Sequence, residues 1–265
     1  MKKSMKVLGL ALALAPLSML TACGGQLDSK PNVDINSAGS YSATTAEDFN
    51  NAVYDETTHV VKSNLVSYKM GVSIEGRDDN GEGGAIKFVG IFKATEEKQE
   101  YAYSSYVNVD EIEATIKYYV PGDGFGYADT NIKGKTEGLD ASLNGKYKIN
   151  EKVSNGIFDD ISAADTASDY TYANILSMLD DFQTEDVTIE KAEKGTKVNF
   201  KITVVDTKYS SEQIFYFLYD NGKCVGCQYE ASATNLSIKV TVEAFDGEIE
   251  YPDFSSYKDF LPSLS

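Results

Sequence analysis

The chain has 265 residues, and Asp and Glu outnumber Lys and Arg by 41 to 24, which gives a formal net charge of −17 at pH 7. A chain this acidic repels phosphate backbones and anionic lipid surfaces, so we expect neither nucleic-acid binding nor direct electrostatic docking on a bilayer. The length allows one large domain or two small ones, with enough residues for a sizeable core.

The N-terminal residues have the pattern of an export signal. Three lysines precede an apolar stretch, Val7 to Leu20, that is too short to span a membrane, which needs roughly 20 apolar residues. The sequence Leu20-Thr21-Ala22-Cys23 then resembles the lipobox of bacterial lipoproteins, whose cysteine is diacylated and becomes the first residue. The resemblance implies a lipoprotein signal peptide over residues 1–22 and a diacylglyceryl anchor on Cys23, outside the cytoplasm on the outer face of the bacterial cell membrane. Ordinary secretion with an incidental cysteine is the alternative.

Residues 23–43 are rich in Gly, Ser, Asn and Asp and have almost no apolar periodicity. This composition predicts a lipid anchor followed by a flexible tether, with a root-mean-square reach on the order of 25 Å. The folded domain is expected to begin near Thr44.

Two segments have the apolar spacing of amphipathic helices. Thr44 and Glu47 form a capping box, and apolar residues then recur near helical spacing up to about Asn64. A second helix is expected from about Tyr170 to Phe182, with Asp169 as its N-cap.

Strict alternation of apolar and polar residues predicts strands through most of the remaining chain. It is clearest over residues 66–75, 112–120, 198–204 and 236–244. Asn221-Gly222 is the strongest hairpin signal, because both residues tolerate the positive φ of a type I′ turn. The pattern predicts nine to eleven antiparallel strands.

Helices and strands in these proportions predict an α+β fold that is mainly antiparallel β. Ten strands at about 4.8 Å spacing make a sheet nearly 50 Å wide, and two helices of about 10 Å diameter cover less than half of one face. We therefore expect a curled half-barrel sheet of about ten strands, covered by two or three helices. Residues 44–250 form this single domain, and residues 251–265 form a C-terminal tail.

The order of lipobox, tether, helix, strands, helix and strands resembles the LolA and LppX/LprG group of lipid-binding lipoproteins. The likeness lies in architecture, over about residues 44–250, and in the lipobox at Leu20 to Cys23. It implies a hydrophobic cavity that takes up acyl chains. Its expected lining is the apolar side of the alternating strands: Tyr68, Met70, Val72, Ile74, Ile86, Phe88, Phe92, Ile116, Tyr118, Phe200, Ile202 and Val204. The same residues are also consistent with a filled core.

The sequence Cys224-Val225-Gly226-Cys227 has the spacing of a redox pair, but it follows a turn and enters a strand rather than a helix. Residues three apart on a regular strand point to opposite faces, so a disulfide would require a bulge, which Gly226 allows. Redox catalysis, a structural disulfide and two separate thiols remain alternatives.

The residues give no indication of enzymatic chemistry. His59 is the single histidine, and no nucleophile elbow, zinc-protease or phosphate-loop motif occurs. Two acidic segments, 78–84 and 159–169, have some resemblance to calcium loops, but solvated loops explain them better. We expect no cofactor, no metal site and a monomer.

Two hypotheses of different class follow. The first is a membrane-anchored lipoprotein that binds a lipid or acyl chain, as a carrier or a sensor. The second is a cell-surface interaction or sensor module that recognises protein or glycan without a ligand cavity, a role that the 18 tyrosines slightly favour.

Overall fold

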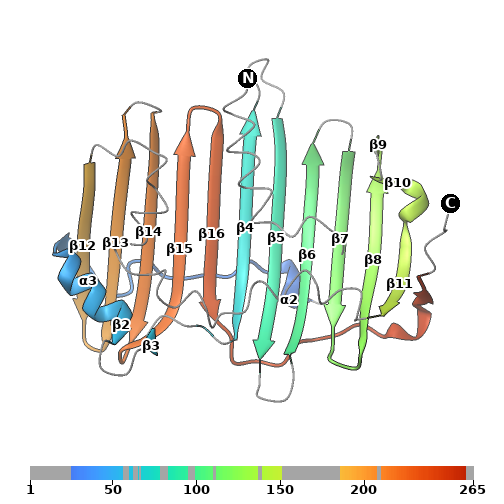
Figure 1. The fold of residues 1–265 in the computed structure, drawn as a ribbon, viewed down its shortest axis with the longest axis horizontal. Helices are drawn as coiled ribbons and strands as arrows, with labels where there is room; N and C mark the ends of the chain where they lie inside the picture. The colour runs from blue at the N-terminus through green and yellow to red at the C-terminus, as the bar shows by residue number, and fades with distance from the viewer. Residues whose placement is uncertain are drawn as a thin grey trace.

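A large open β-sheet dominates the computed structural model of this chain (Figure 1). The structure describes residues 25–55, 60–61, 65, 67–77, 83–94, 99–109, 112–136, 139–150, 186–207 and 210–260. The helix expected over residues 170–182, His59 and both acidic segments except for Gly83 and Gly84 lie outside the described residues.

Two antiparallel meanders lie side by side in the sheet. The first consists of β4 (Tyr68–Arg77), β5 (Gly83–Ala94), β6 (Gln99–Val109), β7 (Ile112–Val120), β8 (Phe125–Lys133) and β11 (Gly145–Asn150). The second consists of β12 (Asp186–Lys194), β13 (Lys197–Asp206), β14 (Ser211–Asp220), β15 (Lys223–Ala233) and β16 (Leu236–Ala244). Antiparallel pairing of β16 with β4 joins them. Strands therefore occur where the alternation predicts them.

The prediction of a half-barrel is wrong. The sheet is 13-stranded and open, in the order β1-β12-β13-β14-β15-β16-β4-β5-β6-β7-β8-β11-β17. It is also mixed, because β11 pairs in parallel with β17 (Lys258–Asp259), whereas β1 (Ser42–Ala43) pairs antiparallel with β12 at the other edge. The two edge strands come from the segments for which the sequence predicts a tether and a tail, and strand alternation gives no signal for such short pieces.

Helices are short in the described part of the chain. The helix expected from Thr44 to Asn64 is α3 (Ala46–Val53), and it ends where β2 (Tyr54–Asp55) pairs with β3 (Val60–Val61). The β-branched Val60 and Val61 favour strand over helix. The remaining regular elements are α2 (Gly25–Asp28), the pair β9 (Lys135–Thr136) and β10 (Leu139–Asp140), and 3₁₀ turns at Ala141–Leu143 and Phe254–Ser256. None of the described helices is long and apolar enough to cross a membrane.

The segment expected to be a flexible tether is part of the folded body from Gly25 onwards. Figure 1 shows it running across the sheet from α2, beside β5 and β6, to α3 beside β12. Leu27 and Ala38 are 4% and 1% exposed, and Ser42 and Ala43 pair with Lys191 and Glu190 of β12. A segment with this many contacts cannot act as a free spacer.

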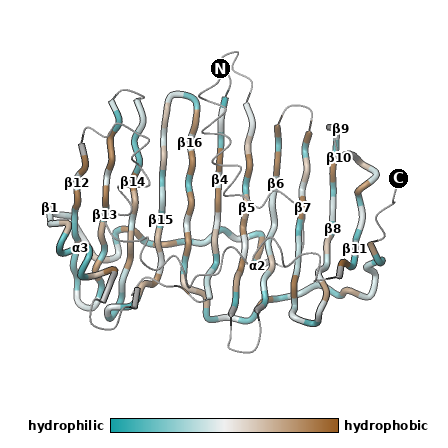
Figure 2. Tube along the Cα trace, in the orientation of Figure 1, coloured by the Kyte–Doolittle hydropathy of each residue, from teal (hydrophilic) through white to brown (hydrophobic). Residues whose placement is uncertain are grey.

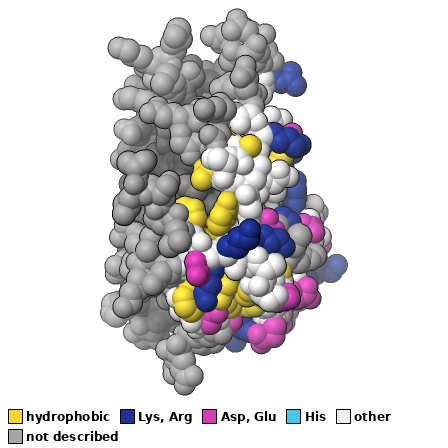
Figure 3. Space-filling model, turned by 90° about the vertical axis from the view of Figure 1, so that its right-hand side faces the viewer, with side chains coloured by type: hydrophobic (Ala, Val, Ile, Leu, Met, Phe, Trp, Pro, Cys, Tyr) yellow, Lys and Arg dark blue, Asp and Glu magenta, His cyan; other side chains and the backbone are white. Residues whose placement is uncertain are grey.

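The expected C-terminal tail also packs on the sheet. The Phe254 ring stacks on Tyr127 of β8 with centroids 3.8 Å apart, and the Phe260 amide donates to the Lys148 carbonyl of β11 at 2.8 Å. Figure 3 views this side of the molecule and shows apolar side chains gathered among lysines and acidic residues. The Lys148 ammonium lies 3.6 Å from the centre of the Phe125 ring. Residues 251–260 therefore extend the sheet and cover part of one face.

Candidate functional site

The strand register places all twelve residues of the expected ligand lining on one face of the sheet. Residues opposite each other in an antiparallel pair point to the same side. The partners Phe200, Phe217, Cys227, Val242, Met70, Gly90, Tyr103, Tyr118 and Ala128 form one continuous row across the sheet from β13 to β8. We call this side of the sheet the apolar face. Figure 2 shows that hydrophobic positions recur along these strands.

The apolar face is buried toward both edges of the sheet. One buried cluster covers β5 to β8 and contains Phe88, Ile116 and Tyr118. The other covers β12 to β15 and contains Phe200, Ile202 and Val204, which are at most 1% exposed beneath Phe49 and Val53 of α3. Ile74 of β4 is also buried, at 5% exposure.

Between the two clusters, the centre of the apolar face is only half-buried. The five other residues of the expected lining all lie here, on β4 and β5, and the β16 residues Val240 and Val242 are half-buried beside them. We call this set the central stripe: Tyr68, Met70, Val72, Ile86, Phe92, Val240 and Val242. At the described apolar-face positions of β4, β5, β15 and β16, no side chain is charged. Large apolar side chains that are accessible and free of charge are what an acyl chain requires of a binding surface.

Aromatic rings continue from the central stripe into the cluster over β6 and β7. Tyr68 stacks on Phe92 with ring centroids 5.0 Å apart, and Phe92 lies 6.2 Å from Tyr101. Tyr101 contacts Tyr118, which contacts Tyr103, at 6.1 and 5.7 Å. Burial raises the pKa of the Tyr103 phenol well above its usual value, which favours the neutral form of this side chain on the apolar face.

The opposite face carries the N-terminal segment, residues 26–41, which we call the strap. It follows a second cross-strand row, in which Asn199, Leu218, Gly226, Glu243, Lys69, Ile91, Ala102, Tyr119 and Tyr127 are successive partners. Leu27 packs in one cluster with Ile91 and Ala102, and a Cβ atom on Gly226 would lie 2.6 Å from Val33. Small residues in this row therefore make room for the strap.

Polar side chains fix the strap at two further points of the same row. Lys69 is 7% exposed, its ammonium donates to the Ser29 hydroxyl at 2.6 Å, and the Asn32 amide donates to the Glu243 carboxylate at 2.6 Å. Burial lowers the pKa of Lys69, and the Glu243 charge opposes that shift. The Asn199 amide, fully buried, donates to the Ile35 carbonyl at 3.0 Å and to the Ser37 hydroxyl at 3.2 Å.

Sequence reasoning missed the strap and the residues that hold it. Lys69 occupies an outward position of the alternating pattern and is therefore expected to be solvated, yet it is buried. The signal that could have found the strap is the pair of mid-strand glycines, Gly71 and Gly226, because a glycine inside a strand often marks close approach of another backbone.

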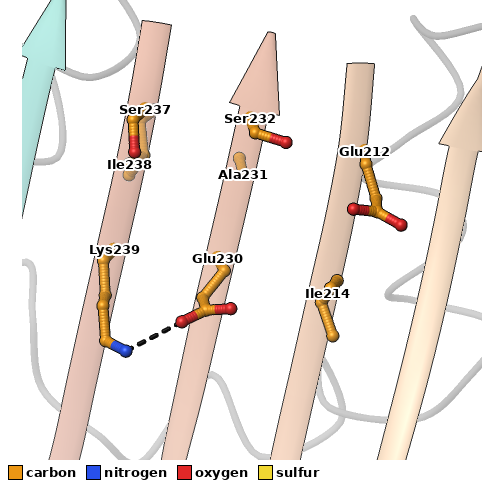
Figure 4. A pocket seen from close by; sticks show the side chains of 8 residues that line it. All are labelled: Glu212, Ile214, Glu230, Ala231, Ser232, Ser237, Ile238 and Lys239. Carbon is orange, nitrogen blue, oxygen red and sulfur yellow. Dashed lines mark hydrogen bonds and ion pairs between the residues drawn. The ribbon is translucent and has the colours of Figure 1, made fainter.

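A small groove of about 250 Å³ lies over β14, β15 and β16, mostly on the strap face (Figure 4). Six of its eight lining residues are on that face: Glu212, Ile214, Glu230, Ser232, Ser237 and Lys239. The Lys239 ammonium pairs with the Glu230 carboxylate at 2.8 Å. None of the twelve expected lining residues contributes to it, and its volume is below the range of about 300–1,000 Å³ typical of small-molecule pockets.

Both thiols of the Cys224-Val225-Gly226-Cys227 sequence are free. A bulge makes Leu218 pair with Gly226 but Tyr219 pair with Cys224, so Val225 is the extra residue and both cysteines reach the apolar face. Burial raises the pKa of Cys224 to about 11, and burial together with Cys224 raises that of Cys227 to about 12. Thiols with such high pKa values are poor nucleophiles at neutral pH.

Within the described ranges, no three His, Cys, Asp or Glu side chains cluster in a way that could hold a metal ion.

No protein-family model matches the chain, and no curated protein matches it. Solved structures with a likeness to it include Rv2717c from M. tuberculosis, which is 8% identical, with 69% of this chain and 93% of that chain covered at a TM-score of 0.20.

Two other solved structures give similar values. A β-barrel-like protein of a domain of unknown function from Brucella abortus is 10% identical, with 69% and 100% coverage of the two chains and a TM-score of 0.22. A putative outer membrane lipoprotein-sorting protein domain from Vibrio parahaemolyticus is 9% identical, with 80% and 97% coverage and a TM-score of 0.23. TM-scores of this size do not bear on function.

Proposed function

We propose that this protein is an extracytoplasmic lipoprotein that binds a hydrophobic ligand, a lipid or acyl chain, on the central stripe of its open sheet. The observation that carries the proposal is the half-buried, uncharged stripe between two buried clusters. Burying apolar surface there is favourable at roughly 25 cal/mol per Å², which suits an acyl chain. The role is one of binding, without catalysis or a cofactor, and the protein acts as a monomer.

The proposed location rests on the N-terminal sequence. In this proposal residues 1–22 are removed, and Cys23 carries a diacylglyceryl group that holds the protein on the outer face of the bacterial cell membrane. Two acyl chains suffice for stable anchoring, because each buried methylene contributes about 0.8 kcal/mol. Replacement of Cys23 by Ser should release the protein from the membrane fraction and abolish its metabolic labelling with an alkynyl fatty acid.

A second candidate is an interaction or sensor module whose apolar face is a filled core. The observation that favours it is the low exposure of the tyrosines beside the central stripe: Tyr101 at 9%, Tyr103 at 3% and Tyr118 at 5%. In this case the face stabilises the sheet, and recognition of protein or glycan takes place elsewhere.

Uptake of a fluorescent fatty acid such as parinaric acid separates the two candidates. We expect saturable binding by the wild-type protein, and at least tenfold weaker binding when Val72 is replaced by Lys, which places a charge on the central stripe. The matched control is Ser73→Lys, one residue along β4 and on the opposite face. If Val72→Lys does not fold, Val72→Phe tests the same position by filling space without adding charge. Absence of uptake by the wild-type protein would contradict ligand binding and favour the second candidate.

A further inference from the structure

The N-terminal end of the strap is fixed to the sheet close to the proposed anchor. The Gln26 side-chain amide donates to the Glu248 carbonyl at 2.8 Å, and its oxygen accepts the Glu250 amide at 3.0 Å. Leu27 is 4% exposed against Ile91 and Ala102 of β5 and β6. Gln26 is therefore a fixed point on the body.

Only Gly24 and Gly25 separate Cys23 from Gln26. An extended chain advances at most about 3.6 Å per residue, so the Cα atom of Cys23 lies within about 11 Å of that of Gln26. A bilayer of about 40–45 Å with a hydrocarbon core of about 30 Å leaves a polar layer of roughly 5–8 Å on each side. A diacylated Cys23 sits in that layer, so the body has no room to stand off from the membrane.

We propose that the surface around α2, formed by Gln26, Asp28, Lys30, Glu248 and Glu250, lies against the headgroups of the bilayer that holds the anchor. We call it the α2 surface. The inference rests on the proposed lipidation of Cys23. The strap thus acts as a rigid mount that sets the orientation of the sheet, in place of the expected spacer of about 25 Å.

The charges at the α2 surface are compatible with a headgroup layer. The Lys93 ammonium pairs with Glu248 at 2.6 Å, and the Lys117 ammonium lies 3.9 Å from Asp28. Lys30 adds an exposed positive charge. Basic and acidic groups are mixed here, although the whole chain carries −17, so this surface repels anionic lipids less than the rest of the protein does.

Headgroup quenching tests the inference on the full, processed chain. The lipidated protein is purified from host membranes in a Cys224→Ala, Cys227→Ala background and placed in vesicles of phosphatidylcholine and phosphatidylglycerol that contain a nitroxide-headgroup lipid. A fluorophore is attached at Lys30→Cys or at the control Glu47→Cys. Glu47 is exposed on α3, at the β12 edge, which is six strands or about 29 Å from β5. We expect at least threefold stronger quenching at position 30.

A spacer variant tests the cause of the proximity. Twenty Gly and Ser residues inserted between Gly24 and Gly25 should remove the difference between the two labelled positions. Equal quenching at positions 30 and 47 in the lipidated protein without the spacer would overturn the inference about the α2 surface and leave the proposed anchor intact. A mass spectrum with an unmodified Cys23 would overturn the proposed anchor and this inference together.

Discussion

Pro31 of the strap lies directly over Gly71 of β4: a Cβ atom on Gly71 would be 2.7 Å from Pro31 Cδ. The contact joins two segments for which the sequence predicts different structures. Pro31 belongs to the expected tether, and Gly71 belongs to an expected strand. Because real Cβ atoms do not approach other atoms so closely, an added methyl group must displace the strap or the strand.

Replacement of Gly71 by Ala should therefore lower the free energy of unfolding by about 1–3 kcal/mol, the usual cost of overpacking. Urea unfolding measures the change. The control is Gly76→Ala on the same strand, where a Cβ atom would meet its nearest neighbours at an ordinary 3.6 Å. In the double variant with Pro31→Ala, the loss should be smaller, because the clashing ring atoms are gone. Equal stability of the Gly71 and Gly76 variants would contradict a packed strap.

The hydrogen bonds of Asn199 allow a second test of the packed strap. The side chain is fully buried and donates to Ile35 and Ser37 of the strap. Replacement of Asn199 by Ala removes these donors and should lower the free energy of unfolding by about 1–3 kcal/mol. Exposed Asn131 on β8 is the control, and its replacement by Ala should change stability by less than about 0.5 kcal/mol. Proteolysis within residues 26–41 should also become faster in the Asn199 variant only.

Tyrosines whose pKa is raised by burial or partial burial predict a loss of stability at alkaline pH. Burial raises the pKa of Tyr229 to about 12, and burial together with the Asp123 carboxylate raises that of Tyr127 to about 12. Burial also raises the pKa of Tyr103 and Tyr251. Above pH 10 the unfolded chain releases these protons and the folded chain retains them, so the free energy of unfolding falls as pH rises from about 10 to 12.

The lowered pKa of Lys69 makes the free energy of unfolding rise with pH below about pH 10.4, which opposes the effect of the tyrosines. This contribution comes from a single group. Urea midpoints at pH 8 and 9 should nearly agree, and those at pH 10.5 and 11.5 should decrease. Tyr229→Phe should reduce the slope by up to about 1.4 kcal/mol per pH unit. Urea midpoints that stay equal from pH 8 to pH 11.5 would contradict the raised pKa of these phenols.

The two free thiols should be almost inert in the folded protein. With pKa values of about 11 and 12 against an ordinary 9.0, their thiolate fraction at pH 8 is lowered by about a hundredfold or more. A Cys23→Ser variant should therefore react with a disulfide reagent at least a hundredfold more slowly when folded than in urea. Comparable rates in both states would contradict the burial of Cys224 and Cys227.

Strand positions and the composition of the apolar face could be predicted from the sequence, because alternation with a period of two is a local property of each strand. Tyr68, Met70 and Val72 alternate with polar or small residues, and the register then carries the same side across to Phe88 and Phe200. The twelve residues therefore share a face although no pairing was known in advance.

The order of the strands and the path of the strap could not be predicted. The pairing of β16 with β4 joins residues that are at least 160 positions apart, and such pairing leaves no local pattern. The strap has few apolar residues, and its contacts depend on glycines elsewhere in the chain, as at Pro31 and Gly71. The sequence indicates the bulge at Val225 only as a distortion that Gly226 allows.

The central claim is that the apolar face binds a hydrophobic ligand. Native mass spectrometry with organic extraction tests it most directly, on a secreted form that starts at Gly24 and is produced in the envelope of its own host. The account predicts a co-purifying lipid of defined mass that is lost or reduced in Val72→Lys and retained in Ser73→Lys. A clean mass of the protein alone, together with no uptake of fluorescent fatty acid, would contradict it.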